Sequence, residues 1–166
     1  MFSLLGRTAV SCLKQRFQVQ MLKRGFADQV AQGTEKLKLS FATPTFALRK
    51  DASVDMVVFP AATGMMGVLP QHVPTVAQLK PGVVTVIEDG KEDKYFVSSG
   101  FAFVTKDRTD ILAVEAVRLE DLDKEAVQRG LNECESAVNS ASDEVSQAIA
   151  QIGVEVHSAM KSALES

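Results

Sequence analysis

The sequence predicts a β-sandwich of about ten short antiparallel strands, followed by a C-terminal α-helical hairpin. Apolar residues alternate along residues 35–118, turn residues recur between them about every 8–12 residues, and after Arg118 the apolar period lengthens to three to five residues. No helix-length segment interrupts the alternating part, which excludes a doubly wound α/β fold. The 166 residues therefore divide into a sandwich domain at 35–118 and a helical domain at 119–166.

Residues 1–26 differ from the rest of the chain in charge. Apolar residues alternate with five basic ones and no acidic one: Arg7, Lys14, Arg16, Lys23 and Arg24. Such a basic amphipathic segment is typical of a mitochondrial transit peptide, and a disordered basic arm is the alternative.

The stretch Arg24-Gly25-Phe26-Ala27 resembles a matrix processing site, so we expect cleavage between Phe26 and Ala27 and a short lead at 27–34. The remaining chain would carry 13 basic and 21 acidic residues, a net charge of −8, which argues against nucleic acid as a partner.

The strands are expected where apolar residues recur at every second position. The rows are Leu37, Leu39 and Phe41; Val54, Met56 and Val58; Val84 and Val86; Phe101 and Phe103; and Ile111 with its neighbours. Turn residues separate them at Thr43-Pro44, Lys80-Pro81-Gly82, Glu88-Asp89-Gly90, Ser98-Ser99-Gly100 and Lys106-Asp107. Short strands at this spacing predict an antiparallel sandwich or a flattened barrel.

Two helices are expected in the last part of the chain, at about residues 120–138 and 143–163. Their apolar residues are Leu119, Leu122, Val127, Leu131, Cys134 and Val138, and then Val145, Ile149, Ile152 and Val156. Residues 139–144 are rich in residues that cap helices and form turns, which favours a hairpin over one continuous helix. Gly130, Gly153 and many small residues permit close packing but bury little area, so the hairpin is expected to be the less stable half.

No arrangement of residues in the sequence is typical of a catalytic or metal site. His72 is the only histidine of the strand region, and His157 lies in the second expected helix. Cys12 and Cys134 lie far apart, and nucleophile and phosphate-binding motifs are absent. No apolar run approaches the ~20 residues of a transmembrane helix. We interpret the chain as a non-catalytic protein without a cofactor, in which His72 holds a turn between Pro70 and Pro74.

The segment from Gly64 to Val84 has three prolines, an imidazole and almost no charge. It resembles a signature of the small central-stalk subunit of F-type ATP synthases, called delta in mitochondria and epsilon in bacteria and chloroplasts. The matching residues are Gly64, Gly67, Val68, Leu69, Pro70, His72, Pro74, Pro81 and Gly82. The stretches Tyr95–Val104 and Ile111–Asp123 also resemble this family, and the basic N-terminal segment selects its mitochondrial form.

The resemblance implies a rotor role on the matrix side of the inner membrane. The partners it implies are the gamma subunit, the c-ring and the very small mitochondrial epsilon subunit, with proton-driven ring rotation passed to the gamma shaft. Met65 and Met66 are then expected at the apolar tip of a loop that contacts the c-ring; their burial inside the sandwich is the alternative. Gly64, Gly67, Pro70, His72, Pro74, Pro81 and Gly82 are expected to fix the backbone of that loop.

Two other functions compete with this interpretation. One is conformational inhibition of ATP hydrolysis through the C-terminal helices. In bacterial relatives an aliphatic-Asp-x-x-Arg-Ala motif binds ATP, but here Leu122-Asp123 is followed by Lys124-Glu125-Ala126, without the arginine. The other is a matrix ligand carrier or enzyme that uses His72.

Overall fold

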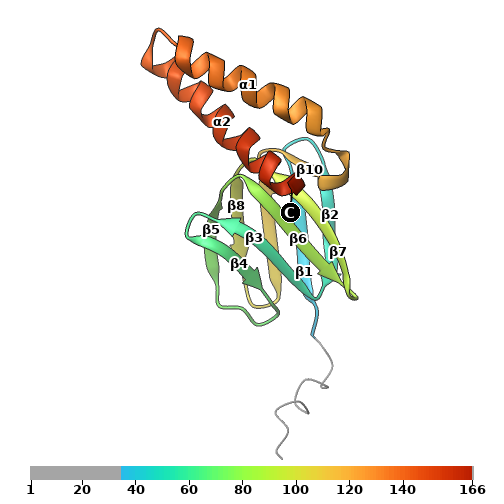
Figure 1. Cartoon of the computed structure of the whole chain (residues 1–166). Helices are drawn as coiled ribbons and strands as arrows, with labels where there is room; N and C mark the ends of the chain where they lie inside the picture. Colours follow the sequence, from blue (N-terminus) through green and yellow to red (C-terminus); the bar gives the residue numbers. More distant parts are fainter. Residues whose placement is uncertain (1–34, 166) are drawn as a thin grey trace, which may run out of the picture. The chain divides into compact units, whose positions relative to one another are not determined.

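The computed structural model describes residues 35–165, which form ten strands, one 3-10 turn and two helices in the expected order (Figure 1). The expected transit peptide at 1–26, its cleavage between Phe26 and Ala27, and the lead at 27–34 lie outside the described residues. None of the described helices is long and apolar enough to cross a membrane.

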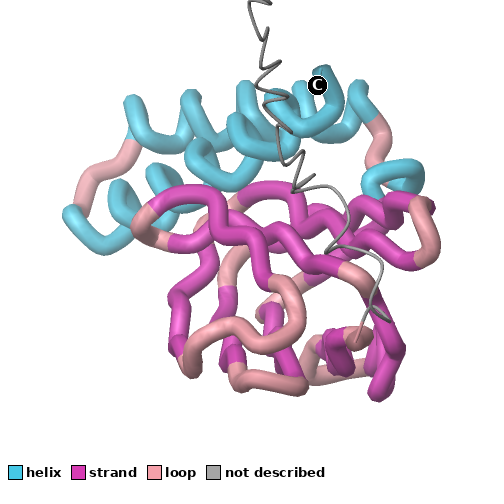
Figure 2. The backbone as a smooth tube through the Cα atoms, turned by 90° about the horizontal axis from the view of Figure 1, so that it is seen from below, coloured by secondary structure: helices cyan, strands magenta, loops and turns pink. Residues whose placement is uncertain are grey.

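The ten strands belong to one sheet that folds over on itself. They are β1 (Leu37–Ala42), β2 (Ala47–Val54), β3 (Met56–Ala61), β4 (Gly64–Val68), β5 (Thr75–Leu79), β6 (Gly82–Glu88), β7 (Lys91–Val97), β8 (Gly100–Val104), β9 (Arg108–Ala113) and β10 (Ala116–Arg118). Their order is β10-β7-β6-β3-β5-β8-β9-β1-β2, with β4 paired to β3 outside this path. The fold brings β2 against β6, although the two are far apart in the order. Figure 2 shows the strands gathered on one side of the two helices.

One strand pair departs from the antiparallel prediction. β1 and β9 pair in parallel, from Lys38 opposite Arg108 to Ala42 opposite Leu112. The long intervening chain, which contains seven other strands, allows β9 to approach β1 in either direction, whereas a short hairpin would force the antiparallel one. Alternating apolar residues do not distinguish the two directions.

The core lies between the two layers of the folded sheet. Phe41 of β1 and Tyr95 of β7 meet edge to face, with ring centroids 5.4 Å apart and an interplanar angle of 89°. Both rings are buried, as are Leu39 and Ile111 on one side and Val84 and Val86 on the other. The rows predicted at 37–41, at 84–86 and at Ile111 therefore face the core.

The row at Val54, Met56 and Val58 is divided between two strands, and of its three residues only Val54 is buried. Val54 is buried at the end of β2, but β3 buries Val57 and Phe59 and leaves Met56 and Val58 half-exposed. The chain bends at Asp55, between the two strands, and a shift of one residue in a strand exchanges its two faces.

The row at Phe101 and Phe103 lies in strand β8, as expected, and faces away from the core. Both phenylalanines are exposed, while Ala102 and Val104 point into the core. β8 is apolar on both faces, so its alternation carried no information on which face is inside. The smaller residues face the interior, where the space between the layers is filled by larger side chains from other strands.

The helical hairpin follows a short 3-10 turn, η1 (Leu119–Asp121). Helix α1 spans Lys124–Ser140 and α2 spans Glu144–Glu165. The Asp123 carboxylate accepts a hydrogen bond of 2.9 Å from the Glu125 amide, and Asp143 accepts one of 2.9 Å from the Ser146 amide. These side chains satisfy amides that a helix start leaves without partners, which explains why each helix begins where it does.

The two helices approach closely at two glycines. A Cβ at Gly130 would lie 2.6 Å from Cδ2 of His157, and a Cβ at Gly153 would lie 2.7 Å from Sγ of Cys134. His157 Nδ1 donates a hydrogen bond of 2.8 Å to the Gly153 carbonyl oxygen. Each helix thus contributes one glycine that makes room for a side chain of the other.

The hairpin buries little apolar side-chain area. Within α1 and α2 only Val127, Leu131, Ala150 and Ala163 are buried among the described residues. We therefore expect the amides of α1 and α2 to exchange with solvent at least about tenfold faster than those of β3 and β6, through openings of lower free energy. Native-state hydrogen exchange checks this, and equal protection of both parts would contradict it.

Candidate functional site

Met65 and Met66 lie in a strand, which corrects the expectation of a loop tip. They belong to β4, where Met65 pairs with Pro60 and Met66 with Phe59 of β3. Met65 is 66% exposed, whereas Met66 is half-buried and packs against the core. Gly64 begins this strand with a φ of +132°, next to the turn that joins β3 to β4. Of the two methionines, Met65 is therefore the one whose side chain is accessible to a partner.

The residues after β4 form a tight turn. The His72 amide donates a hydrogen bond of 3.2 Å to the Leu69 carbonyl, which makes Pro70 and Gln71 the central residues. Gln71 has a φ of +66°, and a proline followed by a residue of positive φ is typical of a type II turn. The His72 Nδ1 lies 2.8 Å from the Val73 carbonyl oxygen, so the imidazole is hydrogen-bonded to the backbone of the next residue, just after the turn.

The other loop residues have separate roles. Pro74 immediately precedes β5, and Pro81 lies between β5 and β6. At the start of β6, Gly82 packs so closely on Pro60 that a Cβ would lie 3.0 Å from the proline Cγ. Gly67 differs from expectation: its φ is not positive, and a Cβ would meet only Val58 Cγ2, at 3.9 Å. The backbone of β4 therefore does not require a glycine there.

An exposed apolar surface of the sheet lies on β5, β8 and β9. Its members are Val76 (67% exposed), Phe101 (52%), Phe103 (41%) and Leu112 (54%). Val76 pairs with Phe103 and Phe101 pairs with Leu112, so all four side chains share one face. We call these four residues the outer apolar face. The alternation of apolar residues along β8 predicts a strand but does not tell which of its two faces is exposed.

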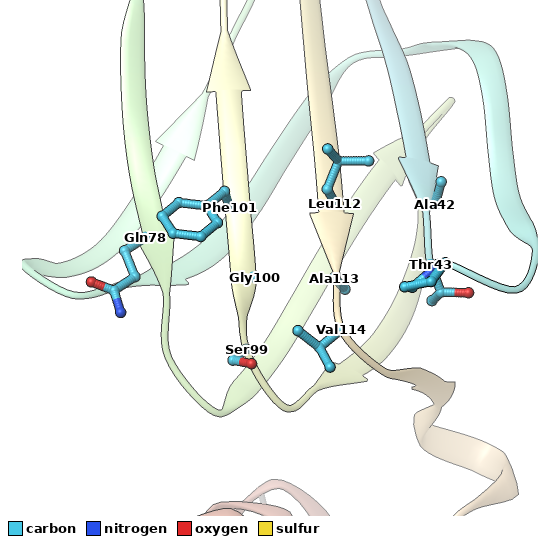
Figure 3. Close-up of a pocket in the computed structure, with 10 residues that line it drawn as sticks. Ala42, Thr43, Gln78, Ser99, Gly100, Phe101, Leu112, Ala113 and Val114 are labelled. Carbon is cyan, nitrogen blue, oxygen red and sulfur yellow. The ribbon is translucent and has the colours of Figure 1, made fainter.

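A hollow of about 380 Å³ adjoins the outer apolar face (Figure 3). Phe101 and Leu112 line it together with Val114 and the small residues Gly100 and Ala113, and none of its lining residues is charged. Gly100 has a φ of +151°, and a Cβ there would collide with the Leu112 carbonyl oxygen and lie 2.8 Å from the Ala113 Cα. The close approach of β8 to β9 thus requires glycine at this position.

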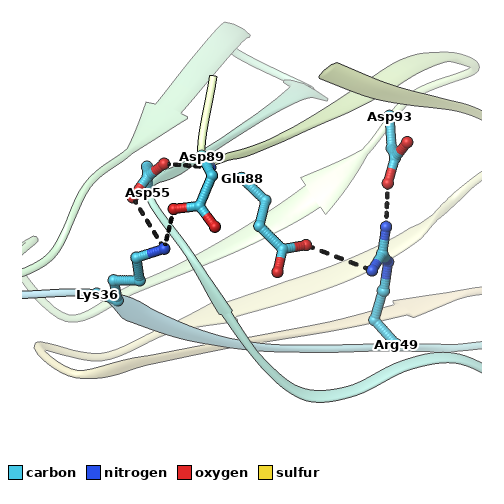
Figure 4. A network of polar contacts seen from close by, with 6 residues as sticks. All are labelled: Lys36, Arg49, Asp55, Glu88, Asp89 and Asp93. Carbon is cyan, nitrogen blue, oxygen red and sulfur yellow. Dashed lines mark hydrogen bonds and ion pairs between the residues drawn. The ribbon is translucent and has the colours of Figure 1, made fainter. Parts of the chain in front are cut away.

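A charged network joins the start of the sandwich to the β6–β7 hairpin (Figure 4). Lys36 Nζ lies 2.5 Å from Asp89 Oδ1 and 3.7 Å from Asp55 Oδ1. The hydrogen bond from Lys36, reinforced by its charge, lowers the pKa of the Asp89 carboxyl, and the same bond raises the pKa of Lys36.

The second half of the network centres on Arg49 of β2. Its guanidinium lies 3.5 Å from Glu88 Oε2 and also contacts Asp93 of β7. The network spans strands that do not pair with each other, so it holds the two layers of the sandwich in register at this end.

The described residues contain no group of three or more His, Cys, Asp or Glu side chains that could hold a metal ion. His72 is absent from the lining of the hollow beside the outer apolar face. The outer apolar face instead presents exposed apolar side chains on a hydrogen-bonded sheet, and such a surface suits binding of a macromolecule.

Comparisons with known proteins agree with the architecture. Residues 36–119 match the family "ATP synthase, Delta/Epsilon chain, beta-sandwich domain". The chain is 52% identical over 130 residues to a mitochondrial ATP synthase subunit delta' of Ipomoea batatas, covering 78% of this chain but only 65% of that relative's length. It is 35% identical to a mitochondrial ATP synthase F(1) complex subunit delta of Dictyostelium discoideum, covering 93% of this chain and 92% of the relative.

A solved structure is similar as well. A chain in the cryo-EM structure of the Euglena gracilis mitochondrial ATP synthase, in its OSCP/F1/c-ring part, superimposes with a TM-score of 0.73 and 33% identity. The match covers 78% of this chain and 82% of that one.

Two glycines of this region are expected to respond differently to alanine. Gly100→Ala combines a strained φ with a backbone collision and should lower the free energy of unfolding by about 3 kcal/mol. Gly67→Ala has room and an ordinary backbone and should change it by no more than about 0.5 kcal/mol. Urea denaturation of both variants checks this. Equal destabilisation by the two substitutions would contradict the strained backbone described at Gly100 and the ordinary one described at Gly67.

The Asp89 carboxyl should titrate below its ordinary pKa because of Lys36. Since its folded-state pKa is lowered, the contact favours folding above the unfolded-state pKa, and this contribution is lost as pH falls through the folded-state value. Lys36→Met should move the Asp89 pKa up toward its ordinary value in an NMR titration of carboxyl carbons. Lys38→Met is the control, and an unchanged Asp89 pKa in Lys36→Met would contradict the contact.

Proposed function

The chain belongs to the ATP synthase delta/epsilon chain family, and we propose that it is a non-catalytic central-stalk subunit of mitochondrial ATP synthase that couples c-ring rotation to the gamma shaft. The observation that carries this proposal is the outer apolar face on β5, β8 and β9. Its proposed location is the matrix side of the inner membrane, peripheral to it.

The outer apolar face is proposed to bind the gamma subunit. Contiguous apolar patches with aromatic residues on a protein surface mark interaction sites, and the centres of interfaces are enriched in such side chains. Phe101 and Phe103 lie side by side on one strand, and the uncharged hollow beside Phe101 offers space for a partner side chain. A closely packed sheet below this face deforms little, which suits a part that must transmit torque.

The exposed end of β4 is proposed to face the c-ring. Met65 is the exposed apolar side chain there, and methionine adapts to surfaces of varying shape. The turn at Leu69–His72 and the packing of Gly82 on Pro60 hold the neighbouring backbone in one conformation. The small mitochondrial epsilon subunit is the third proposed partner.

The competing functions have less support. A carrier that uses His72 would need a pocket at this imidazole, but its Nδ1 is bonded to the adjacent Val73 carbonyl oxygen. An inhibitory arm that grips an acidic partner would need basic helices, whereas residues 119–166 contain ten acidic and three basic residues. The outer apolar face favours the coupling role.

Charge on the outer apolar face should weaken binding of gamma without unfolding the subunit. Phe101→Asp and Phe103→Asp should each cost about 2 kcal/mol of binding free energy, roughly thirtyfold in affinity, because a buried unpaired carboxylate replaces an apolar contact. Titration calorimetry with purified gamma checks this. Lys94→Asp, which places the same side chain at an exposed position of β7, is the control.

Thermal melting separates a binding defect from a folding defect. Since both phenylalanines are exposed, the melting temperature of the free subunit should change little. Unchanged gamma affinity in both phenylalanine variants would refute the assignment of this face.

A further inference from the structure

Helix α2 has an exposed aliphatic stripe on its N-terminal half. Val145, Ile149 and Ile152 are 68%, 65% and 62% exposed. Their spacing of four and three residues places them on one face of the helix. We call these three residues the α2 stripe. Aliphatic side chains this exposed and this regularly spaced are unusual on a helix without a partner.

The α2 stripe continues into a face that is covered by the protein itself. One helical turn further along the same face, Val156 and Ala159 are half-buried, and Ala163 is buried. Helix α2 contacts β6 of the sandwich, and Figure 1 shows the C-terminal end of α2 at the sandwich while its N-terminal half projects beyond it. One continuous apolar face is therefore covered in its C-terminal half and uncovered in its N-terminal half.

Acidic side chains flank the α2 stripe. Glu144 and Glu155 are exposed and project to the same side of it, since they are eleven residues, about three helical turns, apart. Neither forms an ion pair within the described part of the chain. The whole region 119–166 carries ten acidic and three basic residues, so the field around the stripe is negative.

We propose that the α2 stripe binds a basic amphipathic helix of a partner protein. The apolar side of such a helix would extend the apolar face of α2 that is already covered in its C-terminal half, and its lysines or arginines would pair with Glu144 and Glu155. This inference is independent of the proposed rotor function, because it rests on α2 alone and not on the outer apolar face.

The experiment measures binding of a labelled synthetic peptide to the full chain by fluorescence anisotropy. The peptide has roughly 18 residues of leucine and lysine, arranged as five turns of an amphipathic helix. A peptide of the same composition in scrambled order lacks the apolar side, and a third with glutamate for lysine lacks the complementary charge. We expect the first peptide to bind at least about tenfold more tightly than the other two.

Variants locate the site on the chain. Ile149→Asp should weaken binding of the amphipathic peptide at least about tenfold, whereas Gln147→Asp, on the same helix but off the stripe, should change it less than about twofold. Replacing both Glu144 and Glu155 by glutamine should weaken binding and reduce its dependence on salt. Circular dichroism confirms that each variant keeps its helices.

Three results would overturn the proposal. Equal binding by Ile149→Asp and Gln147→Asp would place the site elsewhere. Concentration-dependent dimers that Ile149→Asp abolishes would assign the stripe to a second copy of this chain. A chain without residues 1–26 that binds the peptide about tenfold more tightly than the full chain would assign the stripe to the chain's own basic segment. None of these three results would contradict the binding of gamma to the outer apolar face.

Discussion

Packing across the interior of the sandwich, where Phe41 meets Tyr95 edge to face, is the constraint on which the surface depends. The two layers close around a filled core, so apolar side chains in excess of what this core holds must face outward. β8 shows the consequence, because Ala102 and Val104 occupy the interior and Phe101 and Phe103 are left on the outside. An exposed apolar face is tolerated in a protein that is always bound to its partner, whereas it promotes aggregation of a protein that stays free.

The two halves of the described chain are held together by different kinds of contact. The sandwich has a continuous hydrogen-bonded sheet, a single core and a charged network from Lys36 to Arg49 that fixes one end. The hairpin is held by few buried side chains and by the reciprocal fit of Gly130 with His157 and of Gly153 with Cys134. A stiff half suits transmission of torque, and a half with a lower cost of local opening suits adjustment to a partner.

Sequence reasoning predicted the fold class because the change of apolar period at Arg118 reflects a real change of architecture. It could not predict which face of β8 is buried, since both faces are apolar, nor that the bend at Asp55 exchanges the faces of β3. The glycines and prolines around Met65 and Met66 suggest one loop, whereas the two methionines pair with β3. The parallel pairing of β1 with β9 depends on contacts between distant segments, which local patterns do not encode.

The central claim is that this subunit turns together with the ring and the shaft. The most direct test introduces Met65→Cys, pairs it with a cysteine in the polar loop of the c-ring, and measures proton-driven ATP synthesis before and after oxidative cross-linking of the intact complex. A covalent link between two parts of one rotor leaves their rotation free, so the account predicts a high yield of cross-link with ATP synthesis retained. Loss of ATP synthesis in proportion to the cross-link would show that the subunit and the ring must move relative to each other, which would contradict the account.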